Sequence, residues 1–316
     1  MGKIVDRYAR YKRLAQQKAA NASYNIQFYN FWKQDIPDMW FYRFIESRQL
    51  LRDKKKKICF YSTFGSRDMV TKSYGDVNVF FTGENLKHGS HVKFADHLLN
   101  DPRMDFAMGF ECFEDNRYIR FPLWLLYMFE PESRAEDVVS RCAVLNRPER
   151  LTHRRFACHV SSVDEMGLRE CICKELARIG QVDCAGKTLH NCDDLWKVYG
   201  DDKKKFLENY MFNICPENTN ALGYVTEKVF QAVEAGCIPV YWGSYNCPEP
   251  DVLNQEAVLF WEKDGDNSKL FDFISQLNAS QSLFEAFAAQ DRLKASAAEY
   301  VIEKFNQLEK RISELL

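Results

Sequence analysis

Apolar residues recur along this chain in two different periods, and the two periods alternate. Short runs in which nearly every residue is apolar indicate buried strands, and stretches with an apolar residue every three or four positions indicate helices packed on a sheet. In the first half, the pattern predicts strands at 25–32, 58–64, 77–81 and 105–110, and helices at 39–51 and 92–99. Such alternation is typical of a parallel sheet with covering helices.

A polar stretch at 146–154, which contains Pro148, interrupts this alternation before it resumes. We place a domain boundary there, and predict an N-terminal domain at 1–150, a C-terminal domain at 151–295 and a helical tail at 296–316. Strands are predicted in the second half at 156–160, 182–184, 211–215, 238–242 and 257–261. Helices are predicted at 168–179, around 229–233, and as one or two terminal helices within 281–314.

Composition narrows the class of protein only a little. With 46% hydrophobic residues and a net charge of −2, the chain has an ordinary globular balance and lacks the basic excess of most nucleic-acid binders. No apolar run approaches the ~20 residues of a membrane span. The eleven cysteines are scattered without a disulfide framework, which predicts reduced thiols and a cytoplasmic protein. Residues 1–20 predict a basic amphipathic helix, either solvated and packed on its domain or in contact with a membrane surface.

The segment 215–243 carries the densest group of chemically informative residues. Glu217 and Asn218 directly follow a predicted strand, at the edge where open α/β sheets bind ligands. A helix should start near Thr226, with this residue as its cap, and a helix start favours a phosphate. Lys228 adds a positive charge there. The segment therefore predicts a nucleotide-sugar site; the alternative is a packed strand–helix–strand unit with incidental charges.

The same segment resembles the signature of glycosyltransferase family 10, the α1,3/4-fucosyltransferases, and its bacterial branch in particular. The resemblance rests on Glu217-Asn218, on residues 223–228 and on residues 236–243. It implies a GT-B fold, in which two Rossmann-like domains face an interdomain cleft; the periodic pattern alone also fits other two-domain α/β enzymes. It also implies that the segment binds GDP-fucose, the donor. The residues so assigned to the donor are Glu217, Asn218, Tyr224, Val225, Thr226, Glu227 and Lys228, with Glu227 also a candidate catalytic group. Pro216 stands where the family usually has an aromatic residue.

Glu84 is the candidate catalytic base. It follows the predicted strand 77–81 at the functional edge, and a carboxylate can take the proton of a sugar hydroxyl, which is a poor nucleophile by itself. On the residues alone, a turn or capping role for Glu84 is the simpler interpretation. However, Thr82-Gly-Glu-Asn85 resembles the N-domain motif of the family, whose glutamate is the proposed general base. Segments 108–110 and 117–127 also resemble the segments of the family that follow this motif.

Arg169 lies in the first turns of a predicted helix, where a cation is unfavourable unless it meets an anion. The family has an arginine at a matching place, so the resemblance assigns Arg169 to the donor pyrophosphate; the alternative is a solvated arginine. Asn30, Phe31 and Trp32 end the first strand and are candidates for binding the acceptor, although core packing explains them equally well.

No metal site and no cofactor beyond the donor are predicted. Asp264-Gly-Asp266 resembles a metal-binding Asp-x-Asp motif, but its polar surroundings favour a turn. Cys184, His190 and Cys192 do not have the spacing of a zinc site. The predicted function is inverting transfer of L-fucose from GDP-fucose to an N-acetyllactosamine-type glycan. The alternatives are a GT-B enzyme with another nucleotide sugar and a glycan-binding protein without turnover.

Overall fold

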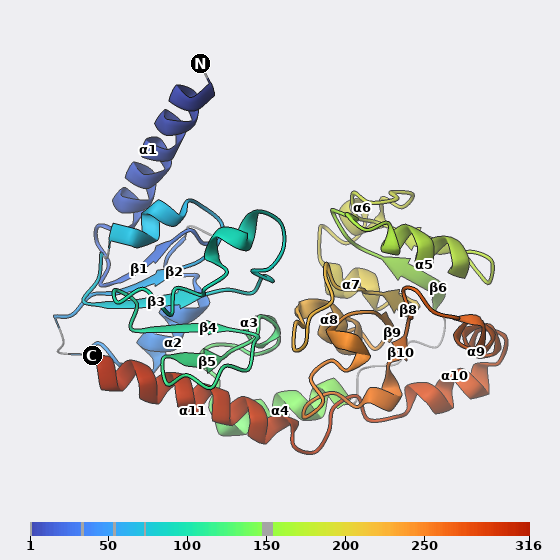
Figure 1. Ribbon diagram of the computed structural model, residues 1–316. Helices are drawn as coiled ribbons and strands as arrows, with labels where there is room; N and C mark the ends of the chain where they lie inside the picture. The colour runs from blue at the N-terminus through green and yellow to red at the C-terminus, as the bar shows by residue number, and fades with distance from the viewer. Residues whose placement is uncertain (1, 33–34, 53–54, 73, 147–153) are drawn as a thin grey trace. The chain divides into compact units, whose positions relative to one another are not determined.

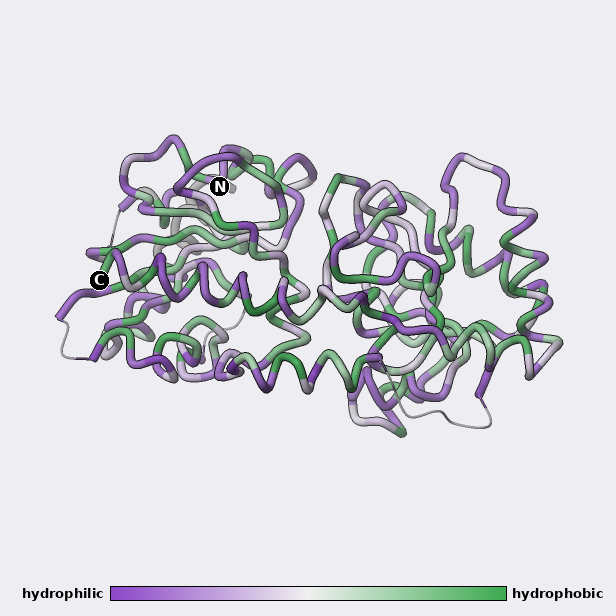
Figure 2. Tube along the Cα trace, turned by 90° about the horizontal axis from the view of Figure 1, so that it is seen from below, coloured by the Kyte–Doolittle hydropathy of each residue, from purple (hydrophilic) through white to green (hydrophobic). Residues whose placement is uncertain are grey.

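The computed structural model of the chain describes residues 2–316, apart from 33–34, 53–54, 73 and 147–153. The chain divides into two compact units. Unit 1 comprises Met1–Arg134 together with Val301–Leu316, and unit 2 comprises Ala135–Tyr300. Each unit contains a five-stranded, wholly parallel sheet, so the predicted α/β architecture of the GT-B type is confirmed (Figure 1). Figure 2 shows that hydrophobic residues run along the strands of both units.

The strands of unit 1 lie side by side in the order of the chain. They are β1 (Ile26–Tyr29), β2 (Ile58–Tyr61), β3 (Val77–Phe81), β4 (Phe106–Gly109) and β5 (Tyr118–Arg120). The helical segments of this unit are α1 (Gly2–Asn21), α2 (Trp40–Ser47), η1 (Arg67–Lys72), η2 (Gly89–Phe94) and α3 (Trp124–Met128). Because consecutive strands are always neighbours, the order of this sheet never reverses.

Buried apolar residues cover both faces of the unit 1 sheet. On one face, Phe41 of α2 stacks on Phe60 of β2 with ring centroids 5.0 Å apart. Phe305, from the returning end of the chain, packs against Trp40 and Phe44 on the same helix. The other face is covered by the 3₁₀ segments and their loops, whose buried residues include Val70, Leu86, Phe94, Leu98 and Met104.

The helix predicted at 92–99 is wrong in both type and extent. The segment forms the 3₁₀ helix η2, which ends at Phe94. His97 and Leu98 have φ angles of +50° and +55°, a left-handed conformation that an α-helix of L-residues cannot contain. Phe94 and Leu98 are nevertheless both buried, and their spacing of four residues resembles one face of a helix.

The unit 2 sheet has the strand order β10–β9–β8–β6–β7. These strands are β6 (Arg155–His159), β7 (Val182–Cys184), β8 (Tyr210–Ile214), β9 (Ile238–Tyr241) and β10 (Leu259–Phe260). The chain moves outward from β6 to β7 and then back past β6 to β8, so the order reverses between β6 and β8. Open α/β sheets bind ligands at such a switch point, outside the carboxyl ends of the strands.

Helices cover the unit 2 sheet through a core that includes Ile172, Leu176, Ile274 and Leu277. The helices are α4 (Ala135–Asn146), α5 (Leu168–Leu176), α6 (Asp194–Lys197), α7 (Lys203–Leu207), α8 (Glu227–Glu234), α9 (Ser268–Ala279) and α10 (Gln281–Ala288). Two short 3₁₀ segments, η3 (Ser244–Asn246) and η4 (Gln255–Ala257), complete the unit.

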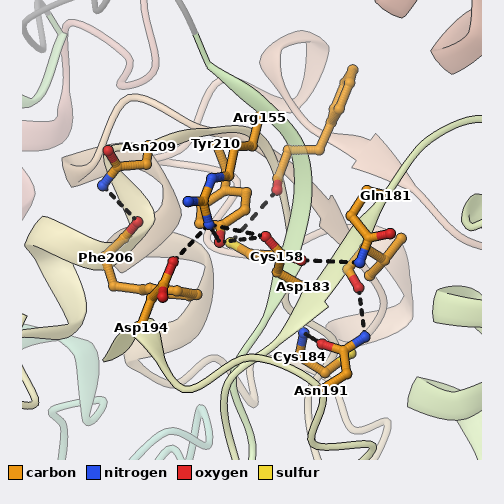
Figure 3. A network of polar contacts seen from close by, with 12 residues as sticks. Arg155, Cys158, Gln181, Asp183, Cys184, Asn191, Asp194, Phe206, Asn209 and Tyr210 are labelled. Atoms are coloured by element: carbon orange, nitrogen blue, oxygen red, sulfur yellow. Dashed lines mark hydrogen bonds and ion pairs between the residues drawn. The ribbon is translucent and has the colours of Figure 1, made fainter. Parts of the chain in front are cut away.

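A polar network ties β6, β7 and β8 together near the start of β6 and β8 (Figure 3). Arg155 reaches Asp183 at 3.3 Å and Asp194 at 2.8 Å. The hydroxyl of Tyr210 donates to Asp183 at 2.8 Å. Because this cluster surrounds the amino-terminal part of the strands, it serves the stability of the sheet and leaves the carboxyl edge to other residues.

The two units divide at Arg134 and Ala135, sixteen residues before the predicted boundary at 150. The polar stretch predicted as a linker lies mostly outside the described residues. Helix α4 belongs to unit 2 because Arg141 pairs with Glu234 of α8 and Asn146 hydrogen-bonds to the backbone of Leu293. The predicted tail forms α11 (Ala297–Leu315). From Val301 onward this helix belongs to unit 1, where Phe305 is buried.

Helix α1 is joined to β1 by a pair of hydrogen bonds. The side-chain amide of Asn21 donates to the carbonyl of Phe28 at 2.9 Å, and its oxygen accepts from the Phe28 N–H at 2.7 Å.

We find no helix among the described residues whose length and hydropathy would let it cross a bilayer. All eleven cysteines are unpaired thiols.

Candidate functional site

The reversal between β6 and β8 is bridged by Arg169, in the first turn of α5. Its guanidinium donates to the carbonyl of Val163, in the loop after β6. It also donates to the carbonyl of Pro216 at 3.2 Å and to Asn218 Oδ1 at 2.7 Å, both in the loop after β8. Arg169 is 5% exposed, and burial lowers the pKa of its guanidinium. The solvated alternative for this residue therefore does not hold.

Arg169 still has one donor without a partner. Its Nε is buried and makes no hydrogen bond to any residue that the structure describes. A buried donor of a charged group is costly to leave unsatisfied. The position of this nitrogen, beside the carboxyl ends of β6 and β8, is therefore suited to an oxygen atom of a ligand.

Glu217, Thr226 and Lys228 form a compact triangle just after β8. The side chain of Glu217 is fully buried, and Lys228 Nζ lies 3.0 Å from its Oε2. The backbone N–H of Thr226 donates to Glu217 Oε1 at 2.7 Å, and its hydroxyl lies 2.8 Å from Oε2. Lys228 Nζ also donates to the Thr226 hydroxyl at 2.8 Å. The residues that the sequence placed at one edge of the sheet are thus brought into direct contact.

Thr226 occupies the cap position of α8, but its side chain does not cap the helix. Its hydroxyl is directed to Glu217 instead, because a buried carboxylate needs several hydrogen-bond donors. The predicted capping role of the Thr226 side chain is therefore wrong. The first anion beside the start of α8 is the Glu217 carboxylate, and Lys228 is held against it.

Gly243 permits the close contact between the loops after β8 and β9. It has a φ of +142°, and an added Cβ would lie 2.8 Å from Glu217 Cγ and 2.9 Å from the Tyr241 hydroxyl. Any larger residue would displace Glu217.

Tyr224 and Val225 are each 1% exposed, so their side chains pack inside unit 2.

The charged groups of the site shift one another's pKa values. Burial by itself lowers the pKa of Lys228, but Glu217 and Glu227 outweigh that effect and the pKa is raised. Burial by itself raises the pKa of Glu227, but Lys228 and Lys203 outweigh that effect and the pKa is lowered. Lys228 and Glu227 are therefore both charged near neutral pH, with 3.9 Å between Nζ and Oε1.

Lys203, at the start of α7, is a cation that the sequence analysis missed. Burial lowers the pKa of its ammonium group; of its charged neighbours, Glu227 raises this pKa and Lys228 lowers it. It forms no ion pair with any residue that the structure describes. Its place in the run Lys203–Lys205 hides it, because such a run usually indicates a solvated surface.

His159, the last residue of β6, is 1% exposed and lies at the same edge. Its Nδ1 lies 2.8 Å from the carbonyl of Ile214 on β8, and its Nε2 lies 2.7 Å from the Ser161 hydroxyl. Burial lowers the pKa of His159 to about 4. The ring is therefore neutral near pH 7 and joins the two strands that flank the switch point.

In unit 1, Glu84 follows β3 in a tight turn. The Thr82 hydroxyl accepts from the Glu84 N–H at 3.0 Å and donates to its carbonyl at 3.1 Å. Gly83 packs so closely on Leu123 that an added Cβ would lie 2.8 Å from it. The turn is thus fixed from both sides, and Glu84 lies partly exposed at the carboxyl edge of the unit 1 sheet.

Glu111 is a second carboxylate at this edge, and sequence reasoning did not single it out. It follows β4, the neighbour of β3. Its Oε2 contacts His97 at 2.9 Å and accepts from the Tyr118 hydroxyl at 3.1 Å. Its other oxygen is buried and has no partner among the described residues.

The three acceptor candidates after β1 differ in exposure. Asn30 and Phe31 are 0% and 7% exposed, whereas Trp32 is 39% exposed. The side-chain amide of Asn30 donates to the carbonyl of Ser66 at 2.9 Å, so it joins two loops. Trp32 is the member of the trio whose ring is open to a ligand.

The two motifs for which we predicted no metal, Asp264-Gly-Asp266 and the group around His190, form hydrogen bonds with residues close by in the sequence. Asp266 accepts from the Ser268 N–H at 2.9 Å, just before α9. His190 contacts the carbonyl of Gly186 and Asp193 through its two ring nitrogens. Within the described part of the chain, no group of three or more His, Cys, Asp and Glu residues is arranged to hold a metal ion.

Both units match known protein families. Residues 26–127 match the N-terminal domain of the α-(1,3)-fucosyltransferase FucT. Residues 151–310 match the C-terminal part of glycosyltransferase family 10, the fucosyltransferases.

Among curated proteins, the chain is similar to α-(1,3)-fucosyltransferase FucT of Helicobacter pylori, with 29% identity over 213 residues, or 59% of this chain and 41% of that protein. It is also similar to α-(1,3)-fucosyltransferase B of Drosophila melanogaster, with 26% identity over 54% of this chain and 40% of that protein. The matched part spans about two fifths of these relatives. A third similarity, 34% identity over 31% of this chain and 23% of that protein, is to GDP-fucose protein O-fucosyltransferase 3 of Danio rerio.

Solved structures support the fold. A crystal structure of an α1,3-fucosyltransferase superposes with a TM-score of 0.60 at 22% identity, covering 90% of this chain and 89% of that one. A second, of an α1,3-fucosyltransferase with GDP-fucose, gives a TM-score of 0.58 at 21% identity and covers 90% of each chain.

Proposed function

Because this chain belongs to glycosyltransferase family 10, we propose that it transfers L-fucose from GDP-fucose to the GlcNAc residue of N-acetyllactosamine-type glycans. The observation that carries the proposal is the cluster of buried charges at the switch point of unit 2. Arg169 and Lys228 come from two different helix starts and meet the loop after β8. This is the edge at which a sheet of this strand order binds a nucleotide.

The donor half of the proposal assigns the pyrophosphate to Arg169 and Lys228. When the bond between fucose and phosphate breaks, negative charge grows on GDP, and preorganised cations stabilise it. The unpartnered Nε of Arg169 is one donor available for a phosphate oxygen. The carboxylate of Glu217 keeps Lys228 charged and in place. The proposal therefore assigns the role of a metal ion at the leaving group to these two cations.

Five further residues are assigned to the donor. The amide of Asn218 is oriented by Arg169 at 2.7 Å and is assigned to the donor with it. Tyr224, Val225 and Thr226 are assigned a contribution through their backbone, because their side chains are buried. Glu227 is assigned to the hydroxyls of fucose or to the positive charge that develops on the sugar in the transition state.

The acceptor half of the proposal assigns the general base to Glu84. The carboxylate takes the proton of the acceptor hydroxyl, in the proposed reaction O3 of GlcNAc, while that oxygen attacks the anomeric carbon of fucose. GDP leaves from the opposite face with the electrons of the broken bond, so the anomeric centre is inverted. Removal of the proton contributes typically about 10²–10⁴-fold to such a step.

A thermal-shift comparison of GDP and UDP tests the donor assignment. A ligand present at about 100 times its Kd stabilises the folded state by about 2.7 kcal/mol, so GDP should raise the Tm by several degrees and UDP should raise it less. A larger effect of UDP would favour a GT-B enzyme with another nucleotide sugar. No effect of either nucleotide would favour a glycan-binding protein without turnover.

A further inference from the structure

Two grooves lie at the carboxyl edge of the unit 1 sheet, where the proposed acceptor would bind. The first, which we term the basic groove, encloses about 610 Å³ and is lined by Arg13, Thr63, Arg67, His91 and Lys93 among others. The second, the aromatic groove, encloses about 250 Å³ and includes Trp32, Asp38, Arg43, Tyr127 and Glu130. The basic groove falls within the range of about 300–1,000 Å³ that is usual for small-ligand sites.

The two grooves meet at one pair of aromatic rings. Trp32 of the aromatic groove lies edge-to-face on Phe64 of the basic groove, with centroids 5.6 Å apart. Both rings are more than a third exposed. Phe64 in turn contacts the ring of His91 at 5.8 Å. Exposed aromatic faces suit the C–H surfaces of sugars, so a glycan could run along both grooves.

The grooves differ in the sign of their charge. The basic groove is lined by three cations, Arg13, Arg67 and Lys93, and one carboxylate, Asp68. A second carboxylate, Asp96, pairs with Arg67, so the groove has an excess of one positive charge. The aromatic groove has two carboxylates, Asp38 and Glu130, against a single cation. An anionic ligand group would therefore be attracted to the basic groove and repelled from the aromatic groove.

The cations of the basic groove are held in different ways. Arg67 binds Asp96 through two hydrogen bonds of 3.0 and 2.9 Å, and Lys93 Nζ donates to the carbonyl of Gly65 at 2.5 Å. These contacts fix the position of both side chains. Arg13, by contrast, is exposed and makes no ion pair or hydrogen bond with any residue that the structure describes.

The groove also contains polar atoms that are buried without a partner. Thr63 is 3% exposed, and its Oγ1 makes no hydrogen bond within the described part of the chain. The same holds for His91 Nδ1. Both residues line the basic groove. Since buried polar atoms are nearly always hydrogen-bonded in folded proteins, these two point to a polar ligand.

We propose that the acceptor glycan of this protein carries an anionic group, a carboxylate, sulfate or phosphate, which binds in the basic groove beside Arg13, Thr63 and His91. This inference rests on the proposed function, because it names the class of acceptor. The reacting sugar lies toward Glu84, the neighbouring sugars contact Trp32 and Phe64, and the anion pairs with Arg13. A neutral acceptor lacks this last contact.

The test measures KM for fucose transfer to four acceptors. These are N-acetyllactosamine itself and the same disaccharide extended by glucuronic acid, by a sulfate ester or by a phosphate ester. At low salt we expect at least one anionic acceptor to have a KM about 5–50-fold below that of the neutral one. The three anionic arms identify which chemistry the groove accepts. The advantage should shrink at high salt, because exposed charges are screened.

Arg13→Ala and Lys12→Ala form a matched pair of variants. Both residues are exposed neighbours on α1, but Arg13 lines the groove and Lys12 is not among its lining residues. Arg13→Ala should raise KM for the favoured anionic acceptor by about 2–5-fold and leave KM for N-acetyllactosamine unchanged. Lys12→Ala should change neither. Equal KM values for neutral and anionic acceptors, or an equal effect of the two variants, would overturn the inference.

Calorimetry of N-acetyllactosamine and its three anionic derivatives in the absence of any nucleotide separates this inference from the proposed function. Binding that weakens in Arg13→Ala would support the basic groove even if no acceptor were fucosylated, and the proposed function alone would then fail. Fucosylation without any preference for an anionic acceptor would leave the proposed function intact and refute the inference.

Discussion

Two carboxylates stand at the carboxyl edge of the unit 1 sheet, and substitution by the isosteric amide separates their roles. Glu84→Gln should lower kcat by about 10²–10⁴-fold and leave the affinity for GDP unchanged, because the proposed donor residues belong to unit 2. Steady-state transfer and GDP titration measure the two quantities. A Glu84→Gln protein with full activity would remove Glu84 from the mechanism.

Glu111→Gln is the control for that experiment. Glu111 is already fixed by His97 and Tyr118, so its substitution should reduce stability modestly and change kcat only a few-fold. If Glu111→Gln abolished transfer while Glu84→Gln did not, the base would be Glu111.

We expect Lys228 to be essential both for the binding of GDP and for the stability of unit 2. Lys228→Ala leaves the fully buried carboxylate of Glu217 without its cation, which typically costs about 3–5 kcal/mol. The double variant Glu217→Gln/Lys228→Ala removes the uncompensated charge and should recover part of that stability. It should still fail to bind GDP, since the cation is missing. Denaturant unfolding and GDP titration of both proteins test this, and tight GDP binding by the double variant would contradict the assignment.

At the residue level, the sequence predicted which polar groups gather at the functional edges, but not how they are paired. Glu217, Asn218 and Lys228 could be placed because they follow a strand and begin a helix. The contact between Thr226 and Glu217 could not, because it depends on the burial of Glu217 under the loop after β9. Glu111 and Lys203 were missed because neither has a local sequence signature.

At the scale of elements, β6 and β8 are joined at their carboxyl ends by His159. In the unfolded chain a histidine titrates near 6.5, whereas burial lowers the pKa of His159 to about 4 in the folded state. Its folded pKa is depressed, so the unfolded state binds the proton more readily. The stability that the neutral ring supports is present above about pH 6.5 and is lost as the pH falls toward 4, by roughly 3 kcal/mol in total.

His159→Gln should flatten the loss of stability between pH 7 and pH 5, because glutamine does not titrate. Urea unfolding at several pH values measures the slope. His190→Gln is the control, since His190 is exposed and Asp193 raises its pKa, an effect of opposite sign. An unchanged slope in His159→Gln would show that this ring does not govern the acid sensitivity of the sheet.

The sequence pattern predicted some elements to the residue and missed others for identifiable reasons. The predicted strands 77–81 and 182–184 have the bounds of β3 and β7. β5 was missed because it has only three residues, of which Tyr118 has a hydroxyl group and Arg120 is charged. α9 was missed because its polar start, with Asp264 and Asp266 nearby, favoured a loop. For β5, pairing with β4 and not local periodicity determines the element. For α9, by contrast, Leu270, Ile274 and Leu277 do recur at helical spacing, so this helix was open to prediction.

At the scale of the whole molecule, the difference between the two sheets locates the proposed chemistry. Unit 2 reverses its strand order between β6 and β8, and the buried cations lie at that reversal. The sheet of unit 1 has no such reversal, and this unit contributes the partly exposed carboxylate of Glu84, aromatic rings and two grooves. The alternation of strands and helices predicted two α/β units. It did not predict that the final helix would return to unit 1, because the partners of Phe305 lie more than 170 residues earlier.

The most direct test of the account is the release of GDP from GDP-fucose, measured with and without N-acetyllactosamine and its anionic derivatives, in the presence of EDTA. We predict release that depends on the acceptor, persists in EDTA, and yields an α-fucosylated product by NMR. Failure of every acceptor to stimulate release, or a product with a β-linked fucose, would contradict it.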